Sequence, residues 1–126
     1  MPARCFTTSR ETAVSADCLF CRIVRREIPA SIVAEDDHCI AFRDIGPQAP
    51  THVLVVPRQH VSTLDDVSDP LLIGRLMTMA ADVARQEKLV EAGYRTVINT
   101  NAGAGQTVFH LHVHVLGGRR MTWPPG

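Results

Sequence analysis

Three histidines, His110, His112 and His114, lie within five residues of one another and alternate with aliphatic residues. Successive side chains of a β-strand point to opposite faces, so the three imidazoles are expected to share one face. Such a row has two chemical uses: several imidazoles can ligate a metal, or one neutral imidazole can act as a nucleophile beside proton-donating neighbours. The alternative without function is a solvent-exposed strand face that happens to be rich in histidine. The residues expected on the opposite, core-facing side are Phe109, Leu111, Val113 and Val115.

A loop with two glycines, residues 101–107, leads into the histidines. Glycine lets backbone N–H groups approach an anion closely, and Gln106 and Thr107 add an amide and a hydroxyl as donors. Asn99 closes the strand that precedes the loop. Glycine is common in hairpin loops, so the loop alone is weak evidence. A loop whose hydrogen-bond donors could surround a phosphate, next to a row of histidines, favours phosphoryl chemistry over a site that only binds a metal.

Two cysteines, Cys18 and Cys21, form a Cys-x-x-Cys pair. The pair leaves metal binding, redox chemistry and coincidence open. The chain has four cysteines, too few and too unevenly spaced for a disulfide scaffold, and Cys5 and Cys39 carry no signal.

Hydrophobic patterning predicts the elements that position these residues. A short helix is expected from a cap at Asp17 to about residue 25, with Pro29 ending it. Strands are expected over residues 31–35, 39–44 and 52–56, with a tight turn at 36–38. The last two strands are expected over residues 94–100 and 108–116.

One long amphipathic helix is expected over residues 70–90. Asp69 and Pro70 form a favourable start, an N-cap acid followed by proline in the first turn. Strands that arrive as hairpins, with a single long crossover helix, favour an antiparallel α+β sheet over a doubly wound parallel one. The apolar residues that recur at three- and four-residue intervals are Leu72, Leu76, Met79, Ala80 and Val83.

Length and charge limit the classes of partner. Thirteen Lys and Arg balance thirteen Asp and Glu, so the chain has no basic field to attract nucleic acid or an anionic membrane. No stretch approaches the roughly 18 apolar residues that span a bilayer. A chain of 126 residues has a modest core and often gains stability by self-association. We expect a cytoplasmic protein with a flexible arm, residues 1–16, although the Ser, Thr and Arg of this arm weakly resemble an organellar presequence.

The segment 110–116 resembles the His-φ-His-φ-His-φ-φ signature of the histidine triad (HIT) superfamily, where φ is an apolar residue. Residues 17–126 resemble the Hint branch, the histidine triad nucleotide-binding proteins. The resemblance implies one HIT domain over 17–126: a five-stranded antiparallel sheet with one long and one short helix, and sheets joined across a homodimer. The further segments that carry the likeness are 27–30, 44–52, 105–109, 116–119 and 123–126.

The resemblance also implies an activity, that of a purine nucleoside phosphoramidase. Such an enzyme hydrolyses the P–N bond of adenosine or guanosine 5′-phosphoramidates, or acts on aminoacyl adenylates, and releases AMP or GMP without a cofactor. By this likeness His112 is the nucleophile that takes the nucleotidyl group, with one ring nitrogen held by a backbone carbonyl. His114 donates to a non-bridging phosphate oxygen, and His52 lines the same site as a fourth histidine.

The substrate-binding positions follow from the same likeness. Asp44 and Ile45 match the positions that receive ribose and base, and Asn99 is expected near the ribose or phosphate. Trp123 resembles a residue that reaches into the partner subunit's site. The loop residues Gly105, Gln106, Thr107 and Val108 are expected to hold the phosphate and leaving group, and Thr107, where serine is commoner, leaves the leaving-group preference open. The expected walls of the base slot, for which core packing is the alternative, are Phe20, Ile23, Phe42 and Leu54.

A structural zinc site is implied by related branches of the superfamily, including the galactose-1-phosphate uridylyltransferases. The matching residues are Cys18, Cys21, His60 and His110. Two cysteines and two histidines make a closed tetrahedral set, which indicates a structural rather than a catalytic zinc. Many Hint-branch proteins lack these cysteines. The alternatives are two half-buried thiols beside an exposed His60, and a redox pair.

Three other functions stay open at this point. The Fhit branch hydrolyses dinucleoside polyphosphates, although the tail, residues 117–126, favours Hint. The fold could instead serve as a nucleotide sensor or as a scaffold for regulatory protein partners. A histidine cluster that stores or senses metal would hold several metal ions per chain.

Overall fold

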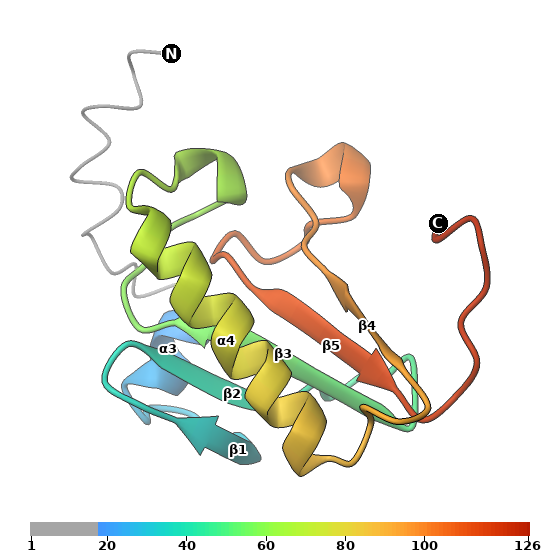
Figure 1. Ribbon diagram of the computed structural model, residues 1–126. Coiled ribbons are helices and arrows are strands. Elements are labelled where there is room, and N and C mark those ends of the chain that lie inside the picture. Colours follow the sequence, from blue (N-terminus) through green and yellow to red (C-terminus); the bar gives the residue numbers. More distant parts are fainter. Residues whose placement is uncertain (1–17) are drawn as a thin grey trace.

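The computed structural model describes residues 18–126 (Figure 1). Both the arm expected at 1–16 and Asp17, the expected helix cap, lie outside these residues. The sheet has five strands in the order β1-β2-β3-β5-β4, and every neighbouring pair is antiparallel, which confirms the α+β expectation. Within residues 18–126, no helix combines the length and apolar character needed to cross a membrane. The elements in chain order are α3 (Leu19–Val24), β1 (Ile32–Glu35), β2 (Cys39–Arg43), β3 (Thr51–Pro57), η1 (Leu64–Asp66), α4 (Pro70–Gln86), β4 (Tyr94–Val97), η2 (Ala102–Ala104) and β5 (Val113–Gly117).

Helix α4 forms where the pattern predicts it and ends earlier. At its start the side chain of Asp69 accepts a hydrogen bond from the Leu71 N–H at 3.0 Å, as an N-cap should. The helix stops at Gln86 rather than near 90 because Lys88 takes a left-handed φ of 61°. That turn lets the Leu89 N–H donate to the Ala84 carbonyl at 2.9 Å, which closes the last helical turn.

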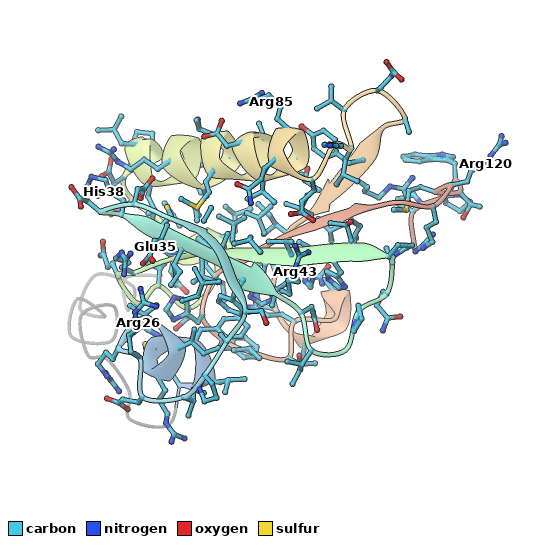
Figure 2. All side chains as sticks on the ribbon, turned by 90° about the horizontal axis from the view of Figure 1, so that it is seen from below. Arg26, Glu35, His38, Arg43, Arg85 and Arg120 are labelled. Atoms are coloured by element: carbon cyan, nitrogen blue, oxygen red, sulfur yellow. The ribbon has the colours of Figure 1, made fainter. Side chains whose placement is uncertain are left out.

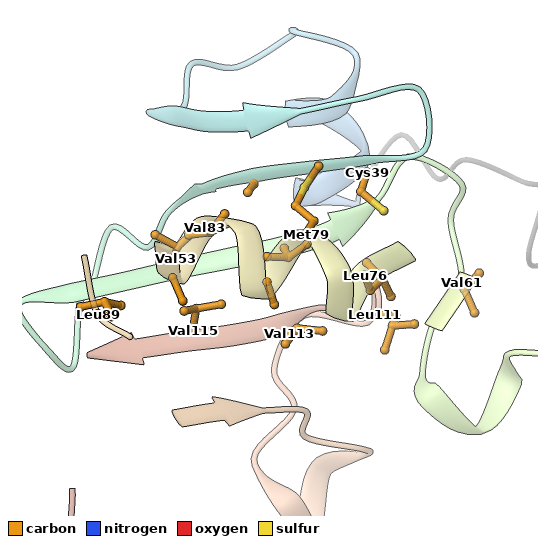
Figure 3. Packing of buried hydrophobic residues seen from close by; sticks show 14 residues of the cluster. Cys39, Val53, Val61, Leu76, Met79, Val83, Leu89, Leu111, Val113 and Val115 are labelled. Carbon is orange, nitrogen blue, oxygen red and sulfur yellow. The ribbon is translucent and has the colours of Figure 1, made fainter. Parts of the chain in front are cut away.

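The two helices cover opposite faces of the sheet (Figure 2). On the α4 face, Leu76, Met79 and Val83 pack against the odd-numbered residues of β3 and β5, such as Val53 and Val113 (Figure 3). On the α3 face, Phe20 and Ile23 of α3 pack against the even-numbered residues Ile40, Phe42, Leu54 and Val56. Because the side-chain period of a strand is two, one sheet supplies both cores.

Helix α3 has six residues, too few to be stable alone, so its position depends on tertiary contacts. The turn after it is tied to β1 by an ion pair between Arg26 and Glu35, with Nη2 and Oε1 2.6 Å apart (Figure 2). Both partners are exposed, and exposed ion pairs contribute little to stability because water and salt screen them. Burial of Phe20 and Ile23 therefore does most to hold α3, together with the cysteines at its start.

The last strand is shorter than predicted. Residues 108–112 lie outside β5, because the Leu111 N–H donates at 2.7 Å to the carbonyl of Val61, in the loop after β3, rather than to a neighbouring strand. Alternation nevertheless persists through this segment: Leu111 is buried in the α4-side core, and His110 and His112 are buried on the α3 side. The prediction for Phe109 was wrong, since 44% of it is exposed.

Candidate active site

The strand register brings four polar side chains together on the α3 face. Leu54 of β3 pairs with His114 of β5, which makes His52 the diagonal neighbour of His114 on the same face. Beyond the end of β2, the Asp44 N–H donates to the His52 carbonyl at 3.0 Å. His112 completes the group, its ring centroid 4.9 Å from that of His114.

Hydrogen bonds fix the tautomers of His52 and His114. The Gln48 N–H donates to His52 Nδ1 at 3.0 Å, so the proton of neutral His52 resides on Nε2. That Nε2 lies 2.9 Å from His114 Nδ1 and donates to it, with Asp44 Oδ2 farther away at 3.4 Å. The proton of His114 is therefore on Nε2, a buried atom that has no hydrogen-bond partner. The chain thus presents an unpaired N–H donor on the wall of the site.

His112 has the opposite arrangement, with a free lone pair on Nε2. Its Nδ1 lies 2.7 Å from the carbonyl oxygen of His110, which can only accept, so Nδ1 carries the proton. The ring of Phe20 stands edge-on to that of His112, with centroids 5.1 Å apart. Burial lowers the pKa of His112, which keeps the imidazole neutral and nucleophilic near pH 7.

Burial also lowers the pKa of His114, and the neighbouring His112 and His52 lower it further, to about 4, against an opposing effect of Asp44. His114 is therefore a neutral N–H donor, not a cation, at physiological pH. Burial likewise lowers the pKa of His52, again against an opposing effect of Asp44.

A cavity of about 360 Å³ opens beside His112 and His114. Its apolar lining comes from α3 and the sheet, and its polar lining includes Asp44 and Thr107. Arg43 also lines the cavity, but its guanidinium pairs at 3.0 Å with Glu87, at the end of α4 on the other face of the sheet. Ile45 also borders the cavity but is 99% exposed, so it does not form a closed wall. The predicted residues that line the cavity are Phe20, Ile23, Phe42, Asp44, Ile45, Leu54, Thr107, Val108, His112 and His114.

Four predicted binding residues do not line this cavity: Asn99, Gly105, Gln106 and Trp123. Both ends of the Gln106 amide are bonded to main chain: Oε1 accepts from the Asn101 N–H at 2.8 Å, and Nε2 donates to the carbonyls of Ser62 and Val108. In this structure the Gln106 side chain shapes the loop and does not face the cavity. Gly105 has a φ of 98°, in the left-handed region that favours glycine.

Sequence reasoning missed five cavity residues: Leu19, Ile28, Pro29, Ala30 and Arg43. Residues 28–30 belong to a segment that carries the family likeness, and the signal that could have identified them is their position between the short helix and the first strand. Leu19 and Arg43 flank predicted residues, and only the three-dimensional arrangement shows that they also reach the cavity.

A second polar cluster lies at the start of α3, and it contains Cys18, Cys21, His60 and His110. Their potential ligand atoms all lie within 4.8 Å of one another. His60 is buried, contrary to the alternative in which it is exposed. Cys18 caps α3, its Sγ accepting from the Cys21 N–H at 3.3 Å. Burial raises the pKa of Cys18, but hydrogen bonds with His110 and His60 outweigh burial and lower it to about 5.

The tautomers of this cluster suit a metal ion. His110 Nε2 donates to the carbonyl of Pro57 at 2.8 Å, so its Nδ1 lone pair faces the thiols. That Nδ1 lies 3.2 Å from His60 Nδ1, and Cys21 Sγ lies 3.2 Å from the same His60 atom. A cation among these atoms would satisfy both nitrogens and both sulfurs.

The group formed by Asp44, His52 and His114 differs, although its potential ligand atoms also lie within 4.8 Å of one another. A metal-binding histidine normally donates its other ring N–H to an acceptor. Here the other nitrogen of His52 accepts from the Gln48 N–H, so Nε2 carries a proton and cannot ligate. The tautomers therefore distinguish the two clusters. The cysteine-containing cluster suits a metal ion, and the group of Asp44, His52 and His114 suits proton donation.

Comparison with known proteins agrees with this geometry. The HIT domain family matches residues 25–121. An uncharacterized HIT-like protein of Synechococcus elongatus is 54% identical over 115 residues, which cover 90% of this chain and 100% of that protein. The purine nucleoside phosphoramidase of Escherichia coli K12 is 49% identical over 108 residues, which cover 84% of this chain and 91% of the relative.

Solved structures also match the chain, and they belong to the same family. The crystal structure of a HIT family hydrolase from Legionella pneumophila matches with a TM-score of 0.85 and 53% sequence identity, covering 87% of this chain and all of that one. The family match spans most of the chain, and the relatives are close over nearly their full length. This chain therefore belongs to the HIT domain family.

Proposed function

We propose that this chain is a purine nucleoside phosphoramidase that works through a nucleotidyl-His112 intermediate. The observation that carries the proposal is the pair of opposite tautomers: an Nε2 lone pair on His112 beside an unpaired Nε2–H on His114, both at one cavity. A nucleophile next to a donor for developing negative charge is the arrangement that nucleotidyl transfer needs. The named activity of the Escherichia coli relative supports the P–N bond as the target.

In the first step His112 Nε2 attacks phosphorus, and the electron pair of the P–N bond moves to the departing nitrogen. That nitrogen takes up a proton from water and leaves as ammonia or an amine. The hydrogen bond to the His110 carbonyl stabilises the positive charge that develops on the His112 ring. In the second step water attacks phosphorus, loses a proton to solvent and displaces His112, which releases the nucleoside monophosphate.

His114 stabilises the charge on phosphorus in both steps, because its Nε2–H donates to a non-bridging oxygen. His52 positions His114 by holding Nδ1 as the acceptor, so that the proton stays on the side of the substrate. Asp44 accepts hydrogen bonds from the ribose. One of its oxygens already accepts from the Gly46 N–H at 2.7 Å, which fixes the carboxylate in place. The apolar lining of the cavity, which includes Phe20, Ile23 and Leu54, takes the base.

The reaction class is tested by comparing kcat/KM for AMP release from adenosine 5′-phosphoramidate and from a diadenosine polyphosphate. The proposal expects the phosphoramidate to be hydrolysed faster, with kcat/KM within the ordinary enzyme range of about 10⁴–10⁸ M⁻¹s⁻¹. Faster hydrolysis of the polyphosphate would instead indicate a Fhit-like activity. AMP binding without turnover of either compound would indicate a nucleotide sensor or scaffold.

We also propose that Cys18, Cys21, His60 and His110 hold a structural zinc ion. Zinc bound there would tie α3 to the loop after β3 and to the segment before β5. Elemental analysis should find one zinc per chain in the wild type and in the control Cys39→Ala, whose thiol is buried in the other core. The zinc should be lost in Cys21→Ser. Several metal ions per chain, or none in the wild type, would contradict the proposal.

A homodimer is the third part of the proposal. Strand β4 is one edge of the five-stranded sheet, where a second copy could continue the ladder. Trp123 is 83% exposed, as expected of a side chain that reaches a partner's site. Sedimentation analysis at micromolar concentration should give twice the mass of the chain, and a monomer at that concentration would contradict this part.

A further inference from the structure

The loop that leads into β3, residues 46–50, fixes the tautomer of His52 without lining the cavity. Its Gln48 N–H donates to His52 Nδ1 at 3.0 Å, so the proton of His52 stays on Nε2, 2.9 Å from His114 Nδ1. A backbone N–H can do this only while the backbone of Gln48 keeps its orientation. Any group that holds Gln48 in place therefore acts on His52 and, through it, on His114.

Arg119, in the segment that follows β5, is such a group. Its Nε–H donates to the Gln48 carbonyl at 3.0 Å, where the two segments lie side by side (Figure 1). Its Nη1–H donates to the Arg120 carbonyl at 3.1 Å. A charged donor makes a stronger hydrogen bond than a neutral one. Among the residues that the structure describes, the other side-chain hydrogen bonds of the loop run within residues 44–52, so Arg119 connects the loop to a segment distant in sequence.

The residue before Arg119 packs closely on the same loop. A Cβ added at Gly118 would lie 2.9 Å from the Cβ of Pro50, so the main chain of Gly118 approaches the proline ring as closely as a glycine allows. Pro47 and Pro50 restrict the backbone of the loop on either side of Gln48. A stiff loop held at two neighbouring points keeps a fixed orientation, and Arg119 supplies the point at Gln48 itself.

We infer that Arg119 is a positioning residue, which keeps the Gln48 N–H on His52 and thereby keeps the N–H of His114 on the side of the phosphate. The catalytic consequence rests on the proposed function, whereas the tautomers of the two histidines do not. Without Arg119 both rings can change tautomer together. A proton on His52 Nδ1 leaves Nε2 as an acceptor, and His114 then donates from Nδ1 and presents a lone pair, not an N–H, to the phosphate oxygen.

Two variants of Arg119 separate the hydrogen bond from the charge. Arg119→Met removes both, whereas in Arg119→Gln the amide nitrogen takes nearly the position of the arginine Nε and keeps a donor without the charge. Arg120→Ala is the control for charge. Arg120 is exposed (Figure 2), and among the described residues only its carbonyl takes part in these hydrogen bonds. Thermal unfolding followed by circular dichroism checks that each variant folds.

Two-bond ¹H–¹⁵N NMR correlations of the histidine rings show which nitrogen carries the proton. They are recorded near pH 7, where the lowered pKa values of His52 and His114 keep both rings neutral. We expect the proton on Nε2 of both rings in the wild type, Arg119→Gln and Arg120→Ala, and a mixture with Nδ1 in Arg119→Met. Unchanged tautomers in Arg119→Met would overturn the inference, whether or not the protein hydrolyses a phosphoramidate.

The kinetic test uses adenosine 5′-phosphoramidate. In Arg119→Met, kcat for AMP release should fall roughly three- to tenfold, the size expected for one charge-assisted hydrogen bond, and in Arg119→Gln it should return to within about twofold of the wild type. In a His52→Leu background, Arg119→Met should cause no further loss, because Arg119 acts through His52.

An equal loss of kcat in Arg120→Ala, or an undiminished effect of Arg119→Met in the His52→Leu background, would overturn the inference alone. Absence of turnover in the wild type would overturn the proposed function, and the histidine tautomers would still decide the role of Arg119.

Discussion

Replacement of His52 tests whether this residue positions His114 for catalysis or only stabilises the fold. In His52→Leu, the Gln48 N–H can turn to water because Gln48 is exposed, but His114 Nδ1 is left without its donor. One buried unsatisfied acceptor should lower the free energy of unfolding by about 1–3 kcal/mol. With Nδ1 free, His114 can carry its proton on either nitrogen, so the donor toward phosphate is present only part of the time. Removing such a donor outright costs about 10²–10³-fold in kcat, so the loss in His52→Leu should lie below that limit and reach about tenfold when the N–H faces the phosphate a tenth of the time.

His52→Gln is the rescue variant. The side-chain amide of glutamine places an N–H at nearly the reach of the histidine Nε2, so it can still donate to His114 Nδ1. We expect kcat for AMP release from adenosine 5′-phosphoramidate to recover most of the loss seen in His52→Leu, with KM little changed in both. Thermal unfolding followed by circular dichroism checks that both variants fold. The reasoning is refuted if His52→Leu keeps kcat within twofold of the wild type, or if His52→Gln is as slow as His52→Leu.

Three further predictions concern stability. Chelation of the proposed zinc should lower the unfolding temperature of the wild type but not that of Cys21→Ser, since a metal ion at about 100 times its Kd adds about 2.7 kcal/mol; an unchanged temperature in the wild type would contradict this. Gly118→Ala should lower the free energy of unfolding, measured with denaturant, by about 2–4 kcal/mol, because the φ of Gly118 is 90° and a Cβ there would lie 2.9 Å from Pro50. Gly74→Ala is the matched control. Gly74 lies in an open position within α4, so this change should raise the free energy of unfolding by about 0.5–1 kcal/mol. The pKa of about 4 at His114 lies below the ordinary histidine value, so the unfolded chain takes up the proton first as pH falls. Between about pH 6.5 and 4 the free energy of unfolding should therefore fall, by about 1–3 kcal/mol for a partly exposed ring, and this slope should weaken in His114→Asn.

The alternation of residue types predicted the two faces of the sheet. His112 and Val113 lie on opposite sides, as period two requires, and Asp69 with Pro70 starts α4 as expected. These features are local, so residue type and spacing determine them. The segment before β5 was harder, because Leu111 pairs with Val61, a partner 50 residues away that no local pattern identifies.

The chemistry of the site could be predicted only in part from the sequence. Spacing alone could not bring Cys18 to His60 and His110, and only the family likeness suggested that set. The family likeness predicted a backbone carbonyl beside one ring nitrogen of His112, and the His110 carbonyl takes that place. The tautomers of His52 and His110 follow instead from a backbone N–H at Gln48 and a carbonyl at Pro57, which no sequence pattern identifies. Gln106 matched the phosphate loop of the family in sequence, yet its amide bonds to main chain on both sides.

Intact-protein mass spectrometry on rapidly quenched mixtures tests the central claim most directly. Wild-type protein and His112→Ala are each mixed with adenosine 5′-phosphoramidate, and AMP release is followed in parallel. The account predicts a transient adduct of one AMP group and release of AMP in the wild type, and neither in His112→Ala, which still binds AMP. AMP release at the wild-type rate by His112→Ala, or an adduct that persists without His112, would contradict it.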